Sequence, residues 1–101
     1  SRSRAGRIAR LFLRLVHGES HDTASFYIFR GLLEALPSLT EEAADAAETL
    51  AALRILHALG LDAGDIPGGE DVYDTAVLTS VIDDRRTFIT RVNRGIEASG
   101  L

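Results

Sequence analysis

The sequence has no cysteine, no lysine and no apolar run long enough to cross a membrane. The absence of cysteine excludes disulfide bonds and thiolate metal sites, and it fits a reducing compartment. A membrane-spanning helix needs about 20 consecutive apolar residues, so we expect no membrane insertion. No signal-peptide pattern is present either, and we therefore expect a cytoplasmic protein.

The chain has 101 residues, which allows one domain with a modest core but leaves no room for a second full domain. Its apolar fraction of 46% and charged fraction of 26% are ordinary for a soluble globular protein. The sequence opens on Ser1 and Arg2 instead of a methionine. We therefore expect residues 1–101 to be a single domain that is a fragment of a longer chain.

The net charge of −4 argues against a domain that is basic overall. Every basic residue is nevertheless an arginine, and most arginines lie near the two ends of the chain. Acidic residues lie mostly between these ends, so the arginines form one basic surface if the ends meet in the fold. The clustered residues are Arg2, Arg4, Arg7, Arg10 and Arg14 at the start, and Arg85, Arg86, Arg91 and Arg94 near the end.

The stretch from Ser38 to Gly60 has the strongest helix signals and is predicted to be the central helix. Ser38 or Thr40 can cap its start, and Ser38 with Glu41 fits a capping box. Gly60 supplies a left-handed residue after the last turn. Its apolar residues cover more than the usual stripe of about 100°, so we expect neighbours on more than one side. These residues are Ala43, Ala46, Ala47, Leu50, Leu53, Ile55, Leu56 and Leu59.

Helical spacing predicts further helices at about 3–17, 23–36 and 83–98. The segment 72–82 is rich in β-branched residues and also reads as a strand, but no second segment offers it a partner, so we predict a short helix there. The sequence thus predicts an all-α fold, a compact bundle of four or five helices without a sheet. The expected core faces are Phe26, Phe29, Leu32, Leu33 and Leu36 on the second helix, and Phe88, Ile89, Val92 and Ile96 on the last.

Two segments invite a chemical interpretation. The sequence HGESHD contains His17 and His21, but Gly18 lies between them at a helix end, and paired histidine ligands need one continuous helical face. We therefore favour a loop and helix cap over a metal site. The glycine-rich loop 61–70 lacks the lysine and the serine or threonine of a phosphate-binding loop.

No arrangement of residues indicates an enzyme. His57 follows Arg54 in an apolar turn, and we interpret it as a partly buried histidine with a local partner because no nucleophile motif accompanies it. No paired carboxylate on a common face and no cofactor motif is present. We therefore expect neither catalysis, nor a cofactor, nor a small-molecule substrate.

Four segments carry a resemblance to the C-terminal helical domain of the RecO family, the DNA repair and recombination mediator protein O. They are LFLRLVHGES at residues 11–20, FYIFRGLLEAL at 26–36, ETLAALRILHALGL at 48–61 and FITRVNRGIEASGL at 88–101. All four are hydrophobic patterns and not chemical signatures. Full-length members of the family resemble one another in placing a DNA-binding OB-fold before this domain, and residues 1–101 do not contain it.

The resemblance implies a non-enzymatic mediator of DNA recombination and repair in the bacterial cytoplasm, associated with the nucleoid. Such a protein binds single- and double-stranded DNA, contacts the acidic tail of single-strand-binding protein, joins RecR and helps to load RecA. Some members carry a four-cysteine zinc module after the third helix. This chain has only the loop 62–71 at that place, so zinc is not implied.

Charge and periodicity, not the resemblance, indicate the binding residues. Arg7, Arg10 and Arg14 share one face of the first predicted helix, and Arg91 and Arg94 lie on the polar side of the last. Guanidinium groups suit both phosphate and carboxylate, so we expect these five to bind DNA or an acidic partner. Two alternatives remain. In the first, the arginines only solvate the surface or pair with Glu41, Glu42 and Asp45. In the second, the chain is an unrelated helical adaptor that binds a partner helix in an apolar groove.

The broken histidine spacing and the missing cysteines predict that folding needs no metal ion. The melting temperature should be the same with and without a chelator, because no ligand set would be emptied. Thermal melts followed by circular dichroism measure this, and a decrease of several degrees in chelator would restore HGESHD as a metal site.

Overall fold

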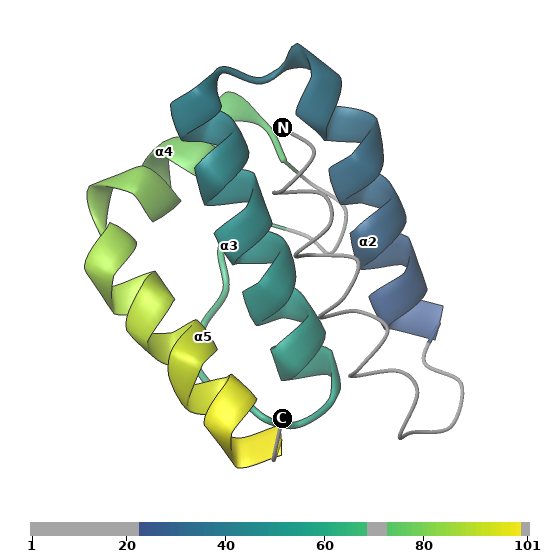
Figure 1. Cartoon of the computed structure of the whole chain (residues 1–101), viewed down its shortest axis with the longest axis vertical. Helices are drawn as coiled ribbons and strands as arrows, with labels where there is room; N and C mark the ends of the chain where they lie inside the picture. Colours follow the sequence, from purple (N-terminus) through teal and green to yellow (C-terminus); the bar gives the residue numbers. More distant parts are fainter. Residues whose placement is uncertain (1–22, 69–72, 100–101) are drawn as a thin grey trace.

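The computed structural model describes residues 23–68 and 73–99, and within them the chain is all-α with no strand (Figure 1). The elements are α2 (Thr23–Ala35), the short 3-10 helix η1 (Leu36–Ser38), α3 (Glu41–Ala58), α4 (Thr75–Asp83) and α5 (Arg85–Ser99). The predicted all-α bundle is thereby confirmed. The helix predicted at 3–17, together with Arg7, Arg10 and Arg14, lies outside the described residues.

Helix α3 lies at the centre of the bundle and packs against α2, α4 and α5 (Figure 1). Every residue of the run Leu50–Leu56 is buried. Successive helical residues point about 100° apart, so a run of this kind can be buried only if neighbours surround the helix. The predicted central helix and its core residues Leu50, Leu53 and Leu56 are confirmed. Small alanines in the first half of α3 let the neighbouring helices approach closely.

The start of α3 is capped by Thr40, whose Oγ1 accepts a hydrogen bond of 3.2 Å from the amide of Ala43. Ser38 has another role: its hydroxyl donates to the carbonyl of Ala35 at 3.0 Å. The predicted capping box of Ser38 and Glu41 is therefore wrong. The physical reason is the 3-10 turn η1, which places Ser38 at the end of the preceding helical segment.

The end of α3 follows the prediction for Gly60, which has a φ of +80°. The amide of Leu61 donates to the carbonyl of Leu56 at 2.8 Å, and the amide of Gly60 donates to that of His57 at 3.0 Å. These two bonds form a Schellman motif, which satisfies carbonyls that the helix leaves without an internal donor. The chain then turns back along α3 into the loop that leads to α4.

The core face of α2 agrees only in part with the prediction. Leu32 is buried and Phe29 and Leu36 pack against the core, as expected. Ile28 is buried as well, whereas Phe26 is 53% exposed and Leu33 is 44% exposed. Apolar side chains occur around most of α2, so periodicity alone does not determine which side of the helix faces the core. Packing against α3 decides it. Tyr27 is exposed as expected, and the expected pair of Arg30 and Glu34 is present on the surface at 3.5 Å.

The segment that reads as either strand or helix forms α4. Asp74 caps it by accepting a 2.9 Å hydrogen bond from the amide of Val77, and Leu78 and Val81 are buried. The following helix, α5, buries Phe88 and partly buries Val92 and Ile96. Ile89, which was expected in the core, is 38% exposed at the edge of the buried face.

Because Leu53 has no exposed surface, replacing it by aspartate would bury a carboxylate without a partner. The cost should unfold a domain whose whole free energy of unfolding is about 5 to 10 kcal/mol. Circular dichroism and thermal melting measure the effect. Leu33→Asp is the matched control, because Leu33 is on the surface and the same substitution there should change the free energy of unfolding by less than about 1 kcal/mol. A Leu53→Asp domain that melts like the parent would contradict this core assignment.

Candidate functional site

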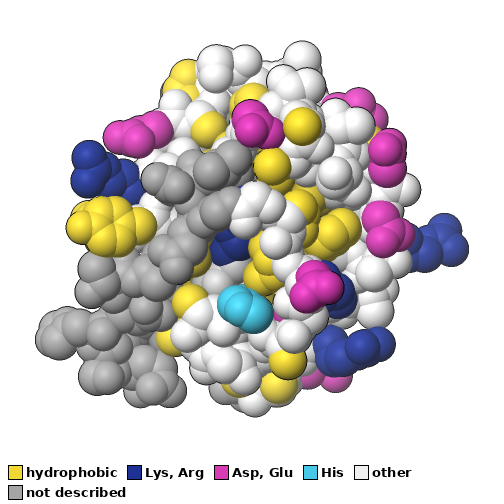
Figure 2. All heavy atoms as spheres, turned by 180° about the vertical axis from the view of Figure 1, so that it is seen from behind, with side chains coloured by type: hydrophobic (Ala, Val, Ile, Leu, Met, Phe, Trp, Pro, Cys, Tyr) yellow, Lys and Arg dark blue, Asp and Glu magenta, His cyan; other side chains and the backbone are white. Residues whose placement is uncertain are grey.

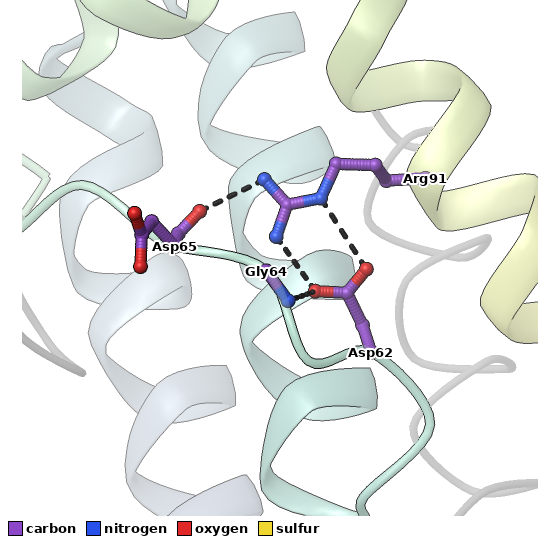
Figure 3. A network of polar contacts seen from close by, with 4 residues as sticks. All are labelled: Asp62, Gly64, Asp65 and Arg91. Atoms are coloured by element: carbon purple, nitrogen blue, oxygen red, sulfur yellow. Dashed lines mark hydrogen bonds and ion pairs between the residues drawn. The ribbon is translucent and has the colours of Figure 1, made fainter.

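The loop between α3 and α4 is held by two arginines, Arg91 from α5 and Arg54 from α3. Figure 3 shows the Arg91 contact, in which the guanidinium lies against the loop beside Asp62, Gly64 and Asp65. Both contacts join segments that are distant in the sequence. They fix the loop to α3 and to α5, the helix that carries Arg91 and Arg94.

Arg91 binds Asp62 through two hydrogen bonds on one edge of its guanidinium. Nη2 lies 2.6 Å from Oδ2, and Nε lies 3.3 Å from Oδ1. Nη1 donates to the backbone carbonyl of Asp65 at 2.8 Å, and the amide of Gly64 donates to Oδ2 of Asp62 at 3.1 Å. The side chains of Arg91 and Asp62 are only 17% and 12% exposed. Arg91, one of the predicted binding residues, is therefore already engaged within the domain.

These contacts keep the carboxylate of Asp62 ionised to low pH. The hydrogen bond from Arg91 lowers the pKa of Asp62 below its ordinary value of 3.8, and this effect outweighs burial, which raises the pKa. The amide of Gly64 and the positive charges of Arg91 and His57 lower it further. The pair is consequently stable as an ion pair at neutral pH.

Glycine occurs where each arginine meets the loop. A Cβ at Gly64 would lie 2.5 Å from Nη2 of Arg91, which is closer than side chains allow. A Cβ at Gly68, where φ is +72°, would lie 2.9 Å from Nη2 of Arg54. Both glycines thus leave room for a guanidinium, and Gly68 also adopts a backbone conformation that side chains disfavour.

Arg54 is only 3% exposed, although no sequence pattern distinguishes it from a surface arginine. Its Nη2 donates to the carbonyl of Pro67 at 2.9 Å, and its guanidinium carbon lies 4.7 Å from the centre of the Tyr73 ring. This stacking is a cation–π contact. His57, which was expected to be partly buried beside Arg54, is instead exposed. The chain turns after α3 and covers Arg54, while the last turn of the helix stays in solvent.

The outer face of α5 carries three exposed arginines, Arg85, Arg86 and Arg94. Among the residues that the structure describes, none of the three forms an ion pair. A shallow pocket of about 390 Å³ lies beside them, lined by Arg85, Arg86, Ile89 and Thr90. Arg94 lies one turn beyond Thr90 along the helix. Of the predicted binding residues, Arg94 is therefore exposed, Arg91 is not, and sequence reasoning missed Arg85 and Arg86 although it noted their charge.

A second pocket of about 400 Å³ lies beside the last turn of α3 and the loop, with Ile28 and Arg54 among its lining residues. Seen from behind in Figure 2, apolar side chains line a hollow beside a histidine, and arginine side chains project at the edge of the molecule. This pocket joins apolar and charged groups of both signs, since His57 and Asp65 also line it. Its lining does not favour an anion as clearly as the outer face of α5 does.

The described residues contain no group of three or more histidine, aspartate or glutamate side chains that could hold a metal ion. The HGESHD segment at 17–22 is outside this region. None of the helices in the described ranges is long and apolar enough to cross a membrane.

The ion pair of Asp62 and Arg91 predicts how stability changes with pH. Because folding lowers the pKa of Asp62, its contribution to stability is present above pH 3.8 and is lost as the pH falls through the lower pKa of the folded state. Asp62→Asn should therefore cost about 1 to 3 kcal/mol at neutral pH, and the difference from the parent should shrink in acid. Urea titrations at several pH values measure it, with Asp65→Asn as control. If the free energy of unfolding of Asp62→Asn differed from that of the parent by the same amount at every pH, this role for the carboxylate would be wrong.

Comparison with known proteins gives no relative to guide the interpretation: no family model, no curated protein and no solved structure matches this chain. The function has to be argued from the surface itself.

Proposed function

We propose that this domain is a non-enzymatic module of a DNA recombination and repair mediator that holds an acidic partner on the outer face of α5. The observation that supports the proposal most directly is the set of exposed arginines, Arg85, Arg86 and Arg94, without ion pairs in the described part of the chain. The biological setting comes from the resemblance to the C-terminal helical domain of the RecO family. In that setting the module works with RecR and assists the loading of RecA.

Unpaired arginines are well suited to such a role. A guanidinium has five donors in a planar fork and can bind a carboxylate or phosphate through two parallel hydrogen bonds. In a chain of net charge −4, three cations without an ion pair among the described residues concentrate positive charge on one helix. An anionic partner is therefore attracted to this helix in preference to the rest of the surface.

The surroundings of the arginines favour an acidic peptide over a DNA backbone. Ile89 lies in the shallow pocket between the arginines and can pack against an apolar side chain of a peptide. Asp83 and Asp84 are exposed directly before α5 and would repel phosphates and carboxylates alike, so they do not distinguish the two partners. We propose the acidic tail of single-strand-binding protein as this peptide. Binding of single- or double-stranded DNA is the alternative, and an experiment must distinguish it from binding of the peptide.

The arginines predicted from the sequence have different roles in the proposal. Arg94 is part of the exposed set, and Arg91 supports the loop in the free domain. Arg7, Arg10 and Arg14 remain the proposed second half of the basic surface. Their test is the triple change to glutamate, with the same binding measurements.

An unrelated helical adaptor is the second candidate, and the exposed stripe of α2 favours it. Phe26, Tyr27 and Leu33 are exposed there with Arg30 between them, and aromatic residues and arginine are enriched in protein interfaces. The partner would be an amphipathic helix that packs on this stripe. Binding of that kind depends mainly on apolar area, so rising salt should weaken it little.

The test of the proposed site replaces Arg85, Arg86 and Arg94 together by glutamine. Fluorescence anisotropy with a labelled acidic tail peptide, and separately with oligothymidylate, should show affinity for the peptide reduced about 3- to 150-fold, because three exposed charge contacts worth about 0.2 to 1 kcal/mol each are lost. Binding by the parent should weaken as salt rises.

The matched control is Arg30→Gln, which removes an exposed arginine that is paired with Glu34 on another helix. The triple change to lysine keeps the charge and should retain part of the binding. If the folded glutamine variant binds the peptide as tightly as the parent, the face of α5 is only a solvated surface. Tighter binding of oligothymidylate than of peptide would assign the face to DNA.

A further inference from the structure

The edge of Arg91 that faces the loop already holds a carboxylate. Asp62 occupies Nε and Nη2 in the arrangement that an external carboxylate would adopt (Figure 3). Arg91 lies one turn before Arg94, which is exposed and belongs to the proposed binding face. Asp62 thus already binds Arg91, the cation next to the site where an acidic partner is proposed to bind.

We propose that Asp62 is an internal competitor, which occupies Arg91 in the free domain and yields this guanidinium to a carboxylate of the acidic partner. The inference rests on the proposed function, because it concerns the same helix, α5. It adds Arg91, which lies on the side of α5 that meets the loop, to the arginines that the partner contacts. It also makes Asp62 the residue that limits affinity for the partner.

The position of the pair permits such an exchange. The side chains of Arg91 and Asp62 are 17% and 12% exposed, so the pair is mostly covered but keeps an edge in contact with solvent. The third contact of Arg91, from Nη1 to the carbonyl of Asp65, uses a different edge of the guanidinium and can persist while the carboxylate changes. Asp62 in turn keeps the amide of Gly64 as a donor.

The exchange leaves Arg91 with the same number of charge-assisted hydrogen bonds, because one carboxylate replaces another on the same guanidinium edge. Asp62 loses both of its bonds to Arg91, and the partner has to offset that loss. Removing the internal carboxylate should therefore strengthen binding, because the partner no longer has to displace it. A purely structural pair predicts the opposite, since loosening the loop would disturb the face of α5.

The experiment measures the affinity of the whole chain for a fluorescein-labelled oligo-aspartate peptide. Asp62→Asn should bind about two- to fivefold more tightly than the parent, as expected for one added charge contact at a partly exposed site. Asp65→Asn is the matched control: it removes an equal charge from the same loop, but Arg91 contacts only the backbone of Asp65. Its effect should be less than about twofold, because it reports only the change in net charge.

The double variant Asp62→Asn with Arg91→Gln separates a freed arginine from a lost negative charge. The gain in affinity should disappear in the double variant, because no guanidinium is left to be freed. A gain that persists there, an Asp62→Asn affinity equal to that of Asp65→Asn, or an affinity below that of the parent would each overturn the inference.

A second measurement uses the unsubstituted protein and does not depend on the folding of a variant. Peptide added during an NMR titration should shift the Arg91 Nε–H signal and the Gly64 amide signal together, since both groups donate to Asp62. If the signals of Arg85, Arg86 and Arg94 saturate while these two stay unchanged, Asp62 keeps Arg91 in the complex and the inference is wrong.

The failure of this inference can be told apart from the failure of the proposed function. Loss of binding in the glutamine variant of Arg85, Arg86 and Arg94, together with no gain in Asp62→Asn, leaves the function standing and rejects the competitor. Absence of peptide binding by the parent and by Asp62→Asn rejects both.

Discussion

The burial of α3 on all sides is the constraint on which the rest of the structure depends. Arg54 lies within the buried run Leu50–Leu56, so its guanidinium has no direct route to solvent. A buried cation needs polar or aromatic partners, and the chain supplies the carbonyl of Pro67 and the ring of Tyr73. The loop after α3 therefore has to fold back over the helix. Gly68 leaves the space in which the loop and the guanidinium meet.

The position of this loop decides which arginines of α5 are free. Once the loop lies against α3, Asp62 is within reach of Arg91 and forms the bidentate pair with it. Arg85, Arg86 and Arg94 point to other sides of the same helix and remain exposed. One helix thus carries an internally neutralised cation beside unpaired ones. Only the exposed arginines of α5 are therefore available to a partner. A count of arginines in the sequence overstates that charge, because it includes Arg91, which Asp62 neutralises.

The exposed surfaces of α5 and α2 differ in chemistry, so they suit different kinds of partner. The face of α5 combines cations with a partly exposed isoleucine, whereas the stripe on α2 is mainly aromatic and aliphatic. The first is suited to an acidic peptide with an apolar side chain, and the second to an apolar helix. Both lie on helices that α3 holds in place, so either partner would meet a largely preformed surface.

The sequence alone determined the features that arise from local chemistry. The extent of α3 and its left-handed Gly60 depend on residues within a turn of each other, and the all-round apolar pattern of α3 required a helical bundle. The tertiary structure decided which arc of α2 is buried, because apolar residues on most sides left several arcs open. It also decided the state of the arginines. Arg91 and Arg94 lie about one turn apart on the same helix, but only Arg91 meets a carboxylate, from a residue 29 positions away. Periodicity places a side chain on a face of its helix, whereas long-range packing determines what that face meets.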